Sequence, residues 1–358
     1  MLKKLKITSF IFPIALSTLL ATQVQANEVD QLIKNTMQER KIPGLQLAVV
    51  KHNKIIKQGY YGVESIATNK PVTKDSIFTI NSMTKAFTGV AAIKLVEQGK
   101  LQLSDTLDMH LENLPNAWQK MTVQQVFSHT SGLPRVLSGK GVELIGDGTS
   151  EGAWQAVQKL PVKFEANSRF QYNQTGYAIL GKIIEKHYQQ PFVKVLEQQF
   201  VKANMPLAKH YSFTFDQQKL DTLAQQYLLP DGNNLQEVEV VFEPLIYPAA
   251  GMATNVSELA NFIAALKQGE FFAPELLKDL WAPAILNNGK TEGFNSRENG
   301  YAAGWQVIDR KVNPAISASG GDANTIIIYP EKELTIIVLT NLIGGLPIEF
   351  VDDIAQYY

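Results

Sequence analysis

The stretch Phe78-Thr-Ile-Asn-Ser-Met-Thr-Lys-Ala-Phe-Thr88 carries a serine and a lysine three positions apart, Ser82 and Lys85. On a helix, residues at this spacing lie on one face, one turn from each other. A serine hydroxyl is a weak nucleophile until a base takes its proton. A lysine amine can be that base if burial or a nearby positive charge lowers its pKa. The spacing therefore predicts a nucleophile and its base on one rigid element.

The residues around this pair favour a buried helix start. Ser82 follows an extended, β-branched run from Ile77 to Ile80, and residues 86–98 form an apolar helical segment. A buried helix start would give Ser82 the positive end of the helix dipole and Lys85 a site of low dielectric. Because serine and lysine are common residues, the alternative is a chance match, with Lys85 solvated on an ordinary helix.

The first 26 residues have the organisation of a secretory signal peptide. A basic start contains Lys3, Lys4 and Lys6. Residues 7–20 form an apolar stretch that is short for a membrane span and is interrupted by Pro13. Val24-Gln25-Ala26 is a small-residue cleavage site. We therefore expect export to the periplasm or the medium, with residues 1–26 removed and no transmembrane anchor left; an uncleaved anchor is the alternative.

The composition excludes several classes of protein and site. The chain has no cysteine, which excludes disulfides, a thiol nucleophile and a cysteine zinc site. Its 33 basic and 34 acidic residues nearly balance, so no electrostatic footprint for nucleic acid is present. None of the five histidines has zinc-site spacing, and no phosphate-binding loop or dinucleotide motif occurs. We therefore expect no metal or organic cofactor and a small-molecule substrate; the sequence does not define an oligomeric state.

Strand patterns at both ends of the chain enclose a mainly helical middle. Strands are predicted at residues 44–50, 54–61, 235–242, 304–308, 325–329 and 334–340. Helices are predicted at residues 27–40, 86–98, 123–127, 153–159, 177–187, 192–201, 256–268 and from 347 onward. The pattern predicts an α/β fold in which residues 27–75 and 246–358 build one mixed antiparallel sheet flanked by helices. The inserted helical part, residues 76–245, would pack beside the sheet and leave a cleft at the seam, where Ser82 falls.

Two further segments have the residue types that this chemistry needs. Tyr172 precedes a helix, and a phenol near a lysine ammonium can be held as phenolate and share the proton transfer. Ala318-Ser-Gly-Gly321 precedes a strand, and an edge strand there could offer a backbone N–H to an oxyanion. The structural alternatives are a packed tyrosine at a helix start and a plain glycine turn.

A rival nucleophile is less well supported. Gly148-Thr-Ser150-Glu-Gly152 matches the G-x-S-x-G pattern, and His187 and His210 follow it. That elbow needs a buried strand directly before the serine, whereas residues 139–148 have the composition of a loop. His129 is a candidate base by residue type, although a buried, hydrogen-bonded loop histidine is the favoured interpretation.

Taken in order, the segments resemble the serine beta-lactamase and penicillin-binding-protein superfamily, near class C beta-lactamases, D-alanyl-D-alanine carboxypeptidases and related esterases. Residues 78–107 are similar to the family's strand, S-x-x-K helix and Gly-Lys-Leu segment. Residues 121–134 resemble its H-T-S-G-L-P segment, and residues 170–181 its tyrosine motif. Residues 247–266 and 302–305 are similar to its P-A-G-G segment and its G-x-G-W strand. Together these cover most of the mature chain.

The resemblance implies a beta-lactamase-like fold and acyl transfer through an acyl-enzyme that water hydrolyses. By the resemblance, Ser82 is the acylated nucleophile, and Lys85 and Tyr172 are the proton-transfer pair. The backbone N–H groups of Ser82 and Gly321 would form the oxyanion hole. The substrate would contact Gln174, Ser319 and Gly320.

Two positions depart from the family pattern. Gln174 stands where the tyrosine motif usually has asparagine, and Ala318 stands where lysine or histidine usually precedes Ser/Thr-Gly. Without a cation at Ala318, a substrate carboxylate loses a partner. We therefore expect an exported serine hydrolase acting on small esters or amides, including peptides. The alternatives are a beta-lactamase or D-alanyl-D-alanine carboxypeptidase, and a non-catalytic cell-wall or penicillin-recognising module.

Overall fold

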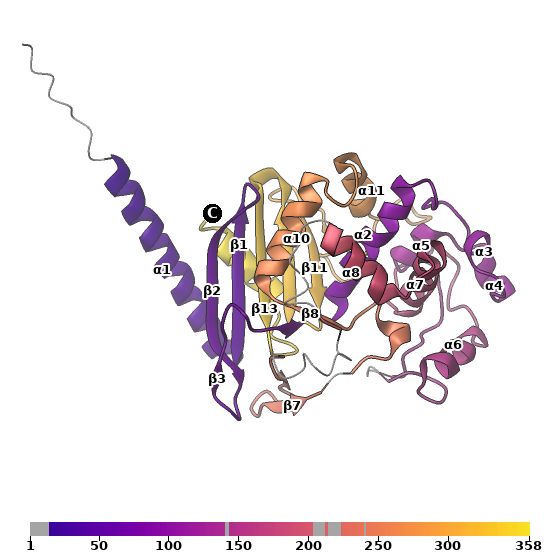
Figure 1. Cartoon of the computed structure of the whole chain (residues 1–358), viewed down its shortest axis with the longest axis horizontal. Helices are drawn as coiled ribbons and strands as arrows, with labels where there is room; N and C mark the ends of the chain where they lie inside the picture. Colours follow the sequence, from indigo (N-terminus) through magenta and orange to yellow (C-terminus); the bar gives the residue numbers. More distant parts are fainter. Residues whose placement is uncertain (1–13, 140–142, 203–211, 214–222, 240) are drawn as a thin grey trace, which may run out of the picture.

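A computed structural model describes residues 14–139, 143–202, 212–213, 223–239 and 241–358 (Figure 1). Among these residues, eight strands form one sheet in the order β3-β2-β1-β13-β12-β11-β10-β9, and each neighbouring pair is antiparallel. The strands are β1 (Gly44–Lys51), β2 (Lys54–Ser65), β3 (Lys70–Pro71), β9 (Gly300–Tyr301), β10 (Gln306–Ile308), β11 (Ala315–Gly320), β12 (Asn324–Tyr329) and β13 (Leu334–Thr340).

Both ends of the chain contribute to this sheet, as the sequence predicts. The N-terminal strand β1 pairs with the C-terminal strand β13 over its whole length, from Leu45 opposite Thr340 to Lys51 opposite Leu334. The pattern of these strands is almost entirely apolar because both faces of the sheet are covered. The predicted α/β fold with an antiparallel sheet built from both termini is therefore confirmed.

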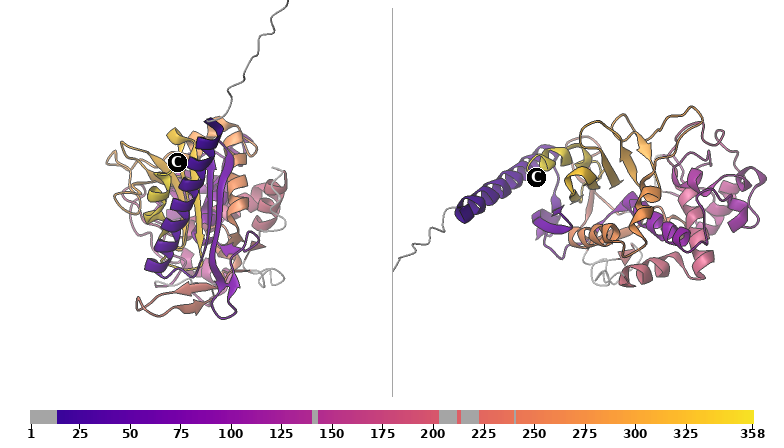
Figure 2. Two further views of the ribbon diagram at one scale, coloured as in Figure 1. Left: turned by 90° about the vertical axis from the view of Figure 1, so that its left-hand side faces the viewer. Right: turned by 90° about the horizontal axis from the view of Figure 1, so that it is seen from above.

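Helices cover the two faces of the sheet. One face packs against α1 (Ile14–Arg40) and α12 (Val351–Ala355), in a core that includes Val29, Val338 and Ile354. Alternate residues of the same strands, such as Ile326 and Ile337, point to the other face and join the core around α2 and α10. Figure 2 shows α1 lying across the outside of the sheet. Within the described residues, no helix is both long enough and apolar enough to cross a membrane.

The helical part lies beside the second face of the sheet, on the right in Figure 1. Its helices are α2 (Thr84–Glu97), α3 (Leu107–His110), α4 (Asn116–Gln119), α5 (Val123–Phe127), α6 (Ser150–Gln158), α7 (Thr175–Tyr188) and α8 (Phe192–Lys202). Nearby are α10 (Val256–Gln268), α11 (Leu277–Trp281) and the short strands β4 (Phe78–Thr79), β5 (Ser212–Phe213) and β8 (Met252–Thr254). The pair β6 (Gln226–Leu228) and β7 (Gln236–Val238) lies instead beside β2, where the N–H of Gln225 donates to the carbonyl of Glu64.

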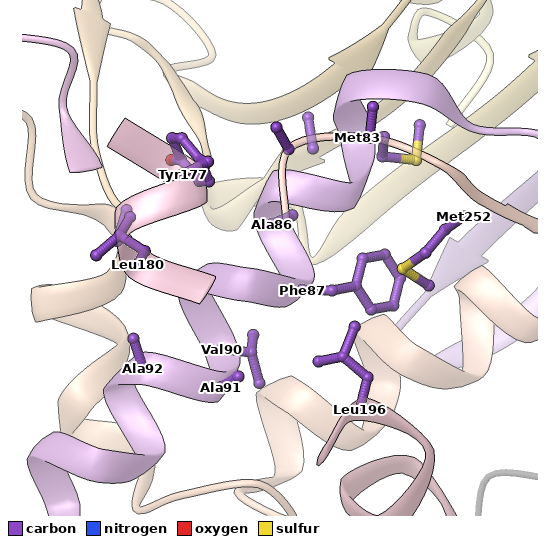
Figure 3. Packing of buried hydrophobic residues seen from close by; sticks show 14 of the residues in the cluster. Met83, Ala86, Phe87, Val90, Ala91, Ala92, Tyr177, Leu180, Leu196 and Met252 are labelled. Atoms are coloured by element: carbon purple, nitrogen blue, oxygen red, sulfur yellow. The ribbon is translucent and has the colours of Figure 1, made fainter. Parts of the chain in front are cut away.

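Helix α2 is buried on nearly all sides, as its apolar composition predicts. Its side chains Phe87 and Val90 lie close to Met252 and Leu196, while Tyr177 of α7 packs near the start of the helix (Figure 3). Phe87 also stacks on Phe262 of α10, with ring centroids 4.2 Å apart. A helix surrounded in this way holds its first turn in a fixed position between the sheet and the helical part.

The segment Ala318–Gly321 differs from the glycine-turn interpretation. Residues up to Gly320 form β11 between β12 and β10, and because its pairing with β10 stops at Ser317, its last three residues are an open edge on that side. Its run of small residues lacks the large β-branched side chains that mark a strand in sequence, which explains why the pattern missed it.

Candidate active site

Ser82 lies in a single turn of 3₁₀ helix, η1 (Asn81–Met83), between β4 and α2. Strand β4 pairs with β8, and the N–H of Ile80 donates to the carbonyl of Met252, which fixes the chain entering the turn. The Thr84 hydroxyl donates to the Asn81 carbonyl at 2.6 Å. Asn81 has φ of +48°, a left-handed conformation that asparagine tolerates better than most residues. The turn therefore presents Ser82 at the buried start of α2.

Lys85 is completely buried one turn after Ser82. Its Nζ lies 3.4 Å from Ser82 Oγ and donates to the Ala249 carbonyl at 2.8 Å. Burial lowers the pKa of the Lys85 amine well below its usual range, because the charged form loses its hydration. Among the described residues, no carboxylate lies within ion-pair distance of Lys85. The arrangement favours a neutral amine beside the serine hydroxyl.

Aromatic rings surround this lysine. Its Nζ lies 4.7 Å from the ring centroid of Tyr172 and 5.2 Å from that of Tyr177. The ring of His129 packs on Tyr172 and Tyr301, with centroids 4.4 and 4.6 Å away. Burial, and secondly the charge of Lys85, lower the pKa of His129 well below its usual range. His129 is thus a neutral packing partner, as the loop interpretation of the sequence expects.

Tyr172 faces the same hydroxyl from the start of α7. Burial raises the pKa of its phenol, although a hydrogen bond with the Ser82 side chain acts in the opposite direction. The phenol therefore stays protonated, in contrast to the phenolate considered from the sequence. The physical reason is that burial removes the hydration that a phenolate needs, and the negative charge of Asp322 adds to the effect.

The end of β11 presents an unpaired backbone edge to Ser82. Pairing with β10 stops at Ser317, so the last three residues of β11 have no partner on that side. Gly320 lies against the turn so closely that a Cβ would meet the Ile80 carbonyl at 2.1 Å and the Ser82 nitrogen at 2.9 Å. Among the described residues, no hydrogen bond from the N–H groups of Ser82 or Gly321 is found. Two free backbone donors therefore come from adjacent segments.

A cavity of about 540 Å³ opens in front of Ser82. Its walls come from Tyr172, the 294–298 loop, Gln306, the 319–322 segment with Thr325, and residues 346–349. The sequence predicted Ser82, Tyr172, Ser319, Gly320 and Gly321 among these residues. It did not predict Phe294, Arg297, Glu298, Asp322 or the 346–349 loop, because loop residues carry no periodic pattern that would locate them in space.

The two departures from the family pattern have different surroundings. Ala318 is buried in the core with Ile326 and Ile328, and its side chain is not among those that line the cavity. Gln174 precedes α7 and also is not a lining residue. Its neighbour Asn173 is buried and accepts a hydrogen bond from the N–H of Gly176. The described residues therefore place no cation at the Ala318 position.

The rival serine lies elsewhere. Ser150 begins α6, and its Oγ donates to Glu243 at 3.1 Å and accepts from the Leu245 N–H. His187 instead bonds His110 at 3.0 Å, and His210 lies outside the described residues. Within the described part of the chain, no group of three or more His, Asp or Glu side chains could hold a metal ion.

A family model described as Beta-lactamase matches residues 29–356. The chain belongs to the Beta-lactamase family. This family is one of serine hydrolases and is related to penicillin-binding proteins.

Two curated relatives place the chain within this family. Protein flp of Staphylococcus aureus (strain N315) is 23% identical over 328 residues, which cover 90% of this chain and 64% of that protein. Penicillin-binding protein 4* of Bacillus subtilis (strain 168) is 26% identical over 307 residues, which cover 78% of this chain and 64% of that protein. The chain thus spans 64% of the length of each of these relatives.

Solved structures share the fold of this Beta-lactamase family chain. The octameric penicillin-binding protein homologue from Pyrococcus abyssi has a TM-score of 0.78 at 22% identity, covering 92% of this chain and 76% of that one. EstCE1, a hydrolase with promiscuous acyltransferase activity, has a TM-score of 0.77 at 20% identity, covering 94% of this chain and 99% of that one. At these identities the likeness establishes the fold alone.

Proposed function

We propose that this protein hydrolyses small esters or amides through an acyl-enzyme on Ser82. The observation that carries the proposal is the completely buried Lys85, whose Nζ lies 3.4 Å from Ser82 Oγ and has no carboxylate within ion-pair distance among the residues that the structure describes. A neutral amine at this distance is a base that can take the hydroxyl proton.

Acylation then follows from the positions of three groups. Lys85 Nζ accepts the proton of Ser82 Oγ while the oxygen attacks the substrate carbonyl carbon. Negative charge develops on the carbonyl oxygen, where the free N–H groups of Ser82 and Gly321 supply two donors. Because the hydroxyl of Tyr172 is protonated, it can donate its proton to the leaving alkoxide or amine as the C–O or C–N bond breaks, and Lys85 restores that proton.

Deacylation reverses the same proton path. A water molecule attacks the acyl-enzyme carbonyl and gives its proton to the Lys85–Tyr172 pair. The oxyanion uses the same two N–H donors, and the proton returns to Ser82 Oγ as the ester bond to serine breaks. No group outside these four residues is needed to balance the protons.

The lack of a cation at Ala318 supports esters and small amides over substrates that carry a carboxylate there. A second candidate is hydrolysis of beta-lactams or of D-alanyl-D-alanine peptides, which the similarity to Penicillin-binding protein 4* favours. A panel of short-chain esters, D-amino-acid peptides and a chromogenic cephalosporin distinguishes the two by which kcat/KM is largest.

Export is part of the proposal. It is supported by the basic start, the apolar stretch at residues 7–20 and the cleavage site at residues 24–26. Removal of residues 1–26 would leave Val29 and Ile33 of α1 in place on the sheet, so the folded domain would keep its core. N-terminal sequencing of the protein recovered from the periplasm or medium tests this, with Asn27 as the expected first residue.

A labelling experiment separates an enzyme from a non-catalytic module. We expect a fluorophosphonate probe to label the wild type and to leave the Ser82→Ala variant unlabelled, while Ser150→Ala, the matched control, is labelled as strongly as the wild type. Mass spectrometry of the labelled peptide should place the adduct on Ser82. Labelling that survives in Ser82→Ala would overturn the assignment, and a wild type that neither labels nor hydrolyses any ester would indicate a non-catalytic module.

A further inference from the structure

Some charged side chains that line the Ser82 cavity have an ion-pair partner, and others have none among the described residues. Nη2 of Arg297 lies 3.0 Å from Oδ2 of Asp352, a carboxylate that also binds Arg310 through both of its oxygens. Glu349 accepts from Arg40 at 3.0 Å. The two remaining acidic residues that line the cavity, Glu298 and Asp322, have no Lys, Arg or His partner within ion-pair distance among the described residues.

These two carboxylates line the same cavity as Ser82 and Tyr172, Asp322 from an exposed position and Glu298 from a buried one. Asp322 directly follows Gly321, and its charge acts on both the Tyr172 phenol and the Glu298 carboxyl. Glu298 is largely buried, and its carboxylate accepts one hydrogen bond, from Asn295 Nδ2 at 3.2 Å. Burial raises the pKa of Glu298; the hydrogen bond from Asn295 and the charge of Arg297 act in the opposite direction, and Asp322 adds a smaller increase. A cation between the two groups would relieve this repulsion.

A third acceptor is in the same cavity. Gln306 lines it and is only 5% exposed, and its Oε1 has no hydrogen-bond partner. A buried amide oxygen without a partner costs free energy that a ligand N–H group can recover. Carboxylates and an amide oxygen accept hydrogen bonds, and an ammonium group supplies up to three donors and a positive charge. The set therefore matches a protonated amine better than a carboxylate or a hydrocarbon.

We propose that Asp322, Glu298 and Gln306 form an ammonium-binding subsite, so that the preferred substrates are esters or amides with a protonated amine near the scissile carbonyl. This inference rests on the proposed hydrolase function and narrows its substrate class. Arg297 also lines the cavity. Its guanidinium forms an ion pair with Asp352, but its Nε and Nη2 have no hydrogen-bond partner among the described residues, so an anionic ester is the competing substrate in the test. The apolar walls at Phe294 and at residues 346–348 leave room for the hydrocarbon part of such a substrate.

Matched benzyl esters test the proposal. Alanine benzyl ester, used as both enantiomers, carries an ammonium group where benzyl isobutyrate carries a methyl group. At pH 7 this amine is mostly protonated, because the pH is below the amine's pKa of about 7.7–8.0. Because an ammonium group also activates the neighbouring carbonyl, the diagnostic quantity is the ratio of the two kcat/KM values and its change between variants. We expect Asp322→Asn and Glu298→Gln each to lower that ratio by about fivefold or more.

Glu349→Gln is the matched control, since it removes a carboxylate of the same cavity that already has a cationic partner. We expect it to change the ratio by less than about twofold. An equal fall in this variant, or no fall in Asp322→Asn, would overturn the subsite. A higher kcat/KM for the anionic ester monobenzyl succinate than for alanine benzyl ester would also overturn the subsite if Arg297→Gln removes this preference. That result would show that the cavity binds anions.

Binding without turnover separates this inference from the proposed function. In the Ser82→Ala background, calorimetric titration should detect benzylamine, and adding Asp322→Asn should weaken its binding by about fivefold or more, with benzyl alcohol as the neutral control. If the wild type hydrolyses no ester but this difference is found, the hydrolase assignment fails and the subsite stands. If esters are hydrolysed but benzylamine binds the Ser82→Ala variant and the Ser82→Ala, Asp322→Asn double variant equally, the subsite fails and the hydrolase assignment stands.

Discussion

The groups on the two sides of Ser82 differ in burial and in charge. On the helix side, Lys85 is completely buried among aromatic rings, and its one hydrogen-bond acceptor besides Ser82 is the Ala249 carbonyl. On the cavity side, Glu298 and Asp322 are acidic groups without a cationic partner among the described residues. Burial lowers the pKa of the amine on the first side, whereas the second side presents carboxylates to the cavity. Reactivity and selectivity are thus set by different elements, and each can be disturbed separately.

The largest expected effect comes from removing the base. Lys85→Met keeps a side chain of similar length but has no proton acceptor, so kcat/KM for ester hydrolysis should fall by about 10³-fold. The measurement is steady-state kinetics on a neutral ester. Lys94→Met, a partly exposed lysine of the same helix that pairs with Glu97, is the control and should keep its activity. Equal activities of wild type and Lys85→Met would show that another group accepts the proton.

The next effect concerns the proton relay. Tyr172→Phe retains the ring beside Lys85 and deletes the hydroxyl that bonds Ser82, so kcat should fall by about 10²-fold with little change in melting temperature. Tyr60→Phe, which removes a hydroxyl from β2, is the control. A large loss of stability in Tyr172→Phe with unchanged kcat would instead assign the hydroxyl a structural role.

The contact between η1 and β11 should be sensitive to one added carbon. Gly320→Ala places a methyl group 2.1 Å from the Ile80 carbonyl, and the two segments must separate. We expect the free energy of unfolding to fall by about 1–3 kcal/mol and kcat to fall with it, because the two N–H donors move apart. Gly289→Ala, at a loop glycine with nothing within 4 Å, should leave kcat unchanged. Normal kcat in Gly320→Ala would rule out the proposed oxyanion geometry.

The smallest effect is on stability as a function of pH. Lys85 is neutral when folded and charged when unfolded below pH ~10.4, so the unfolded state binds the extra proton and wild-type stability rises with pH in that range. Relative to Lys85→Met, the free energy of unfolding should increase by up to about 1.4 kcal/mol per pH unit. Denaturant titrations at several pH values measure this. Parallel profiles for the two proteins would indicate that Lys85 is charged in the folded state.

Much of the fold could be predicted from the sequence where periodic or continuous apolar patterns were long. Strand β13, helix α10 and helix α5 begin and end at the predicted residues, because their buried faces repeat with the strand or helix period or are apolar throughout. Strand β11 could not be predicted, since its small residues carry no such pattern. The helix α1 extends further toward the N-terminus than residue 27, the predicted start.

For the site, the sequence predicted the residues that share a local motif and missed those brought together by loops. Ser82 and Lys85 are one helical turn apart, so their proximity follows from helix geometry alone. Arg297 and Asp322 lie in separate loops, and only the paths of those loops bring both to one cavity. Nothing in their local sequence indicates that Arg297 pairs with Asp352, or that Asp322 has no cationic partner within the described part of the chain.

The sequence by itself determined that a serine and a lysine lie on one face of a helix start, and that strands from both ends of the chain form one sheet. Only the tertiary structure decided what state and surroundings these groups have. Burial by segments distant in sequence lowers the pKa of Lys85, and the end of β10 leaves β11 with a free edge beside Ser82. Spacing is a local property of the chain, whereas hydration and charge balance depend on everything that packs around a group.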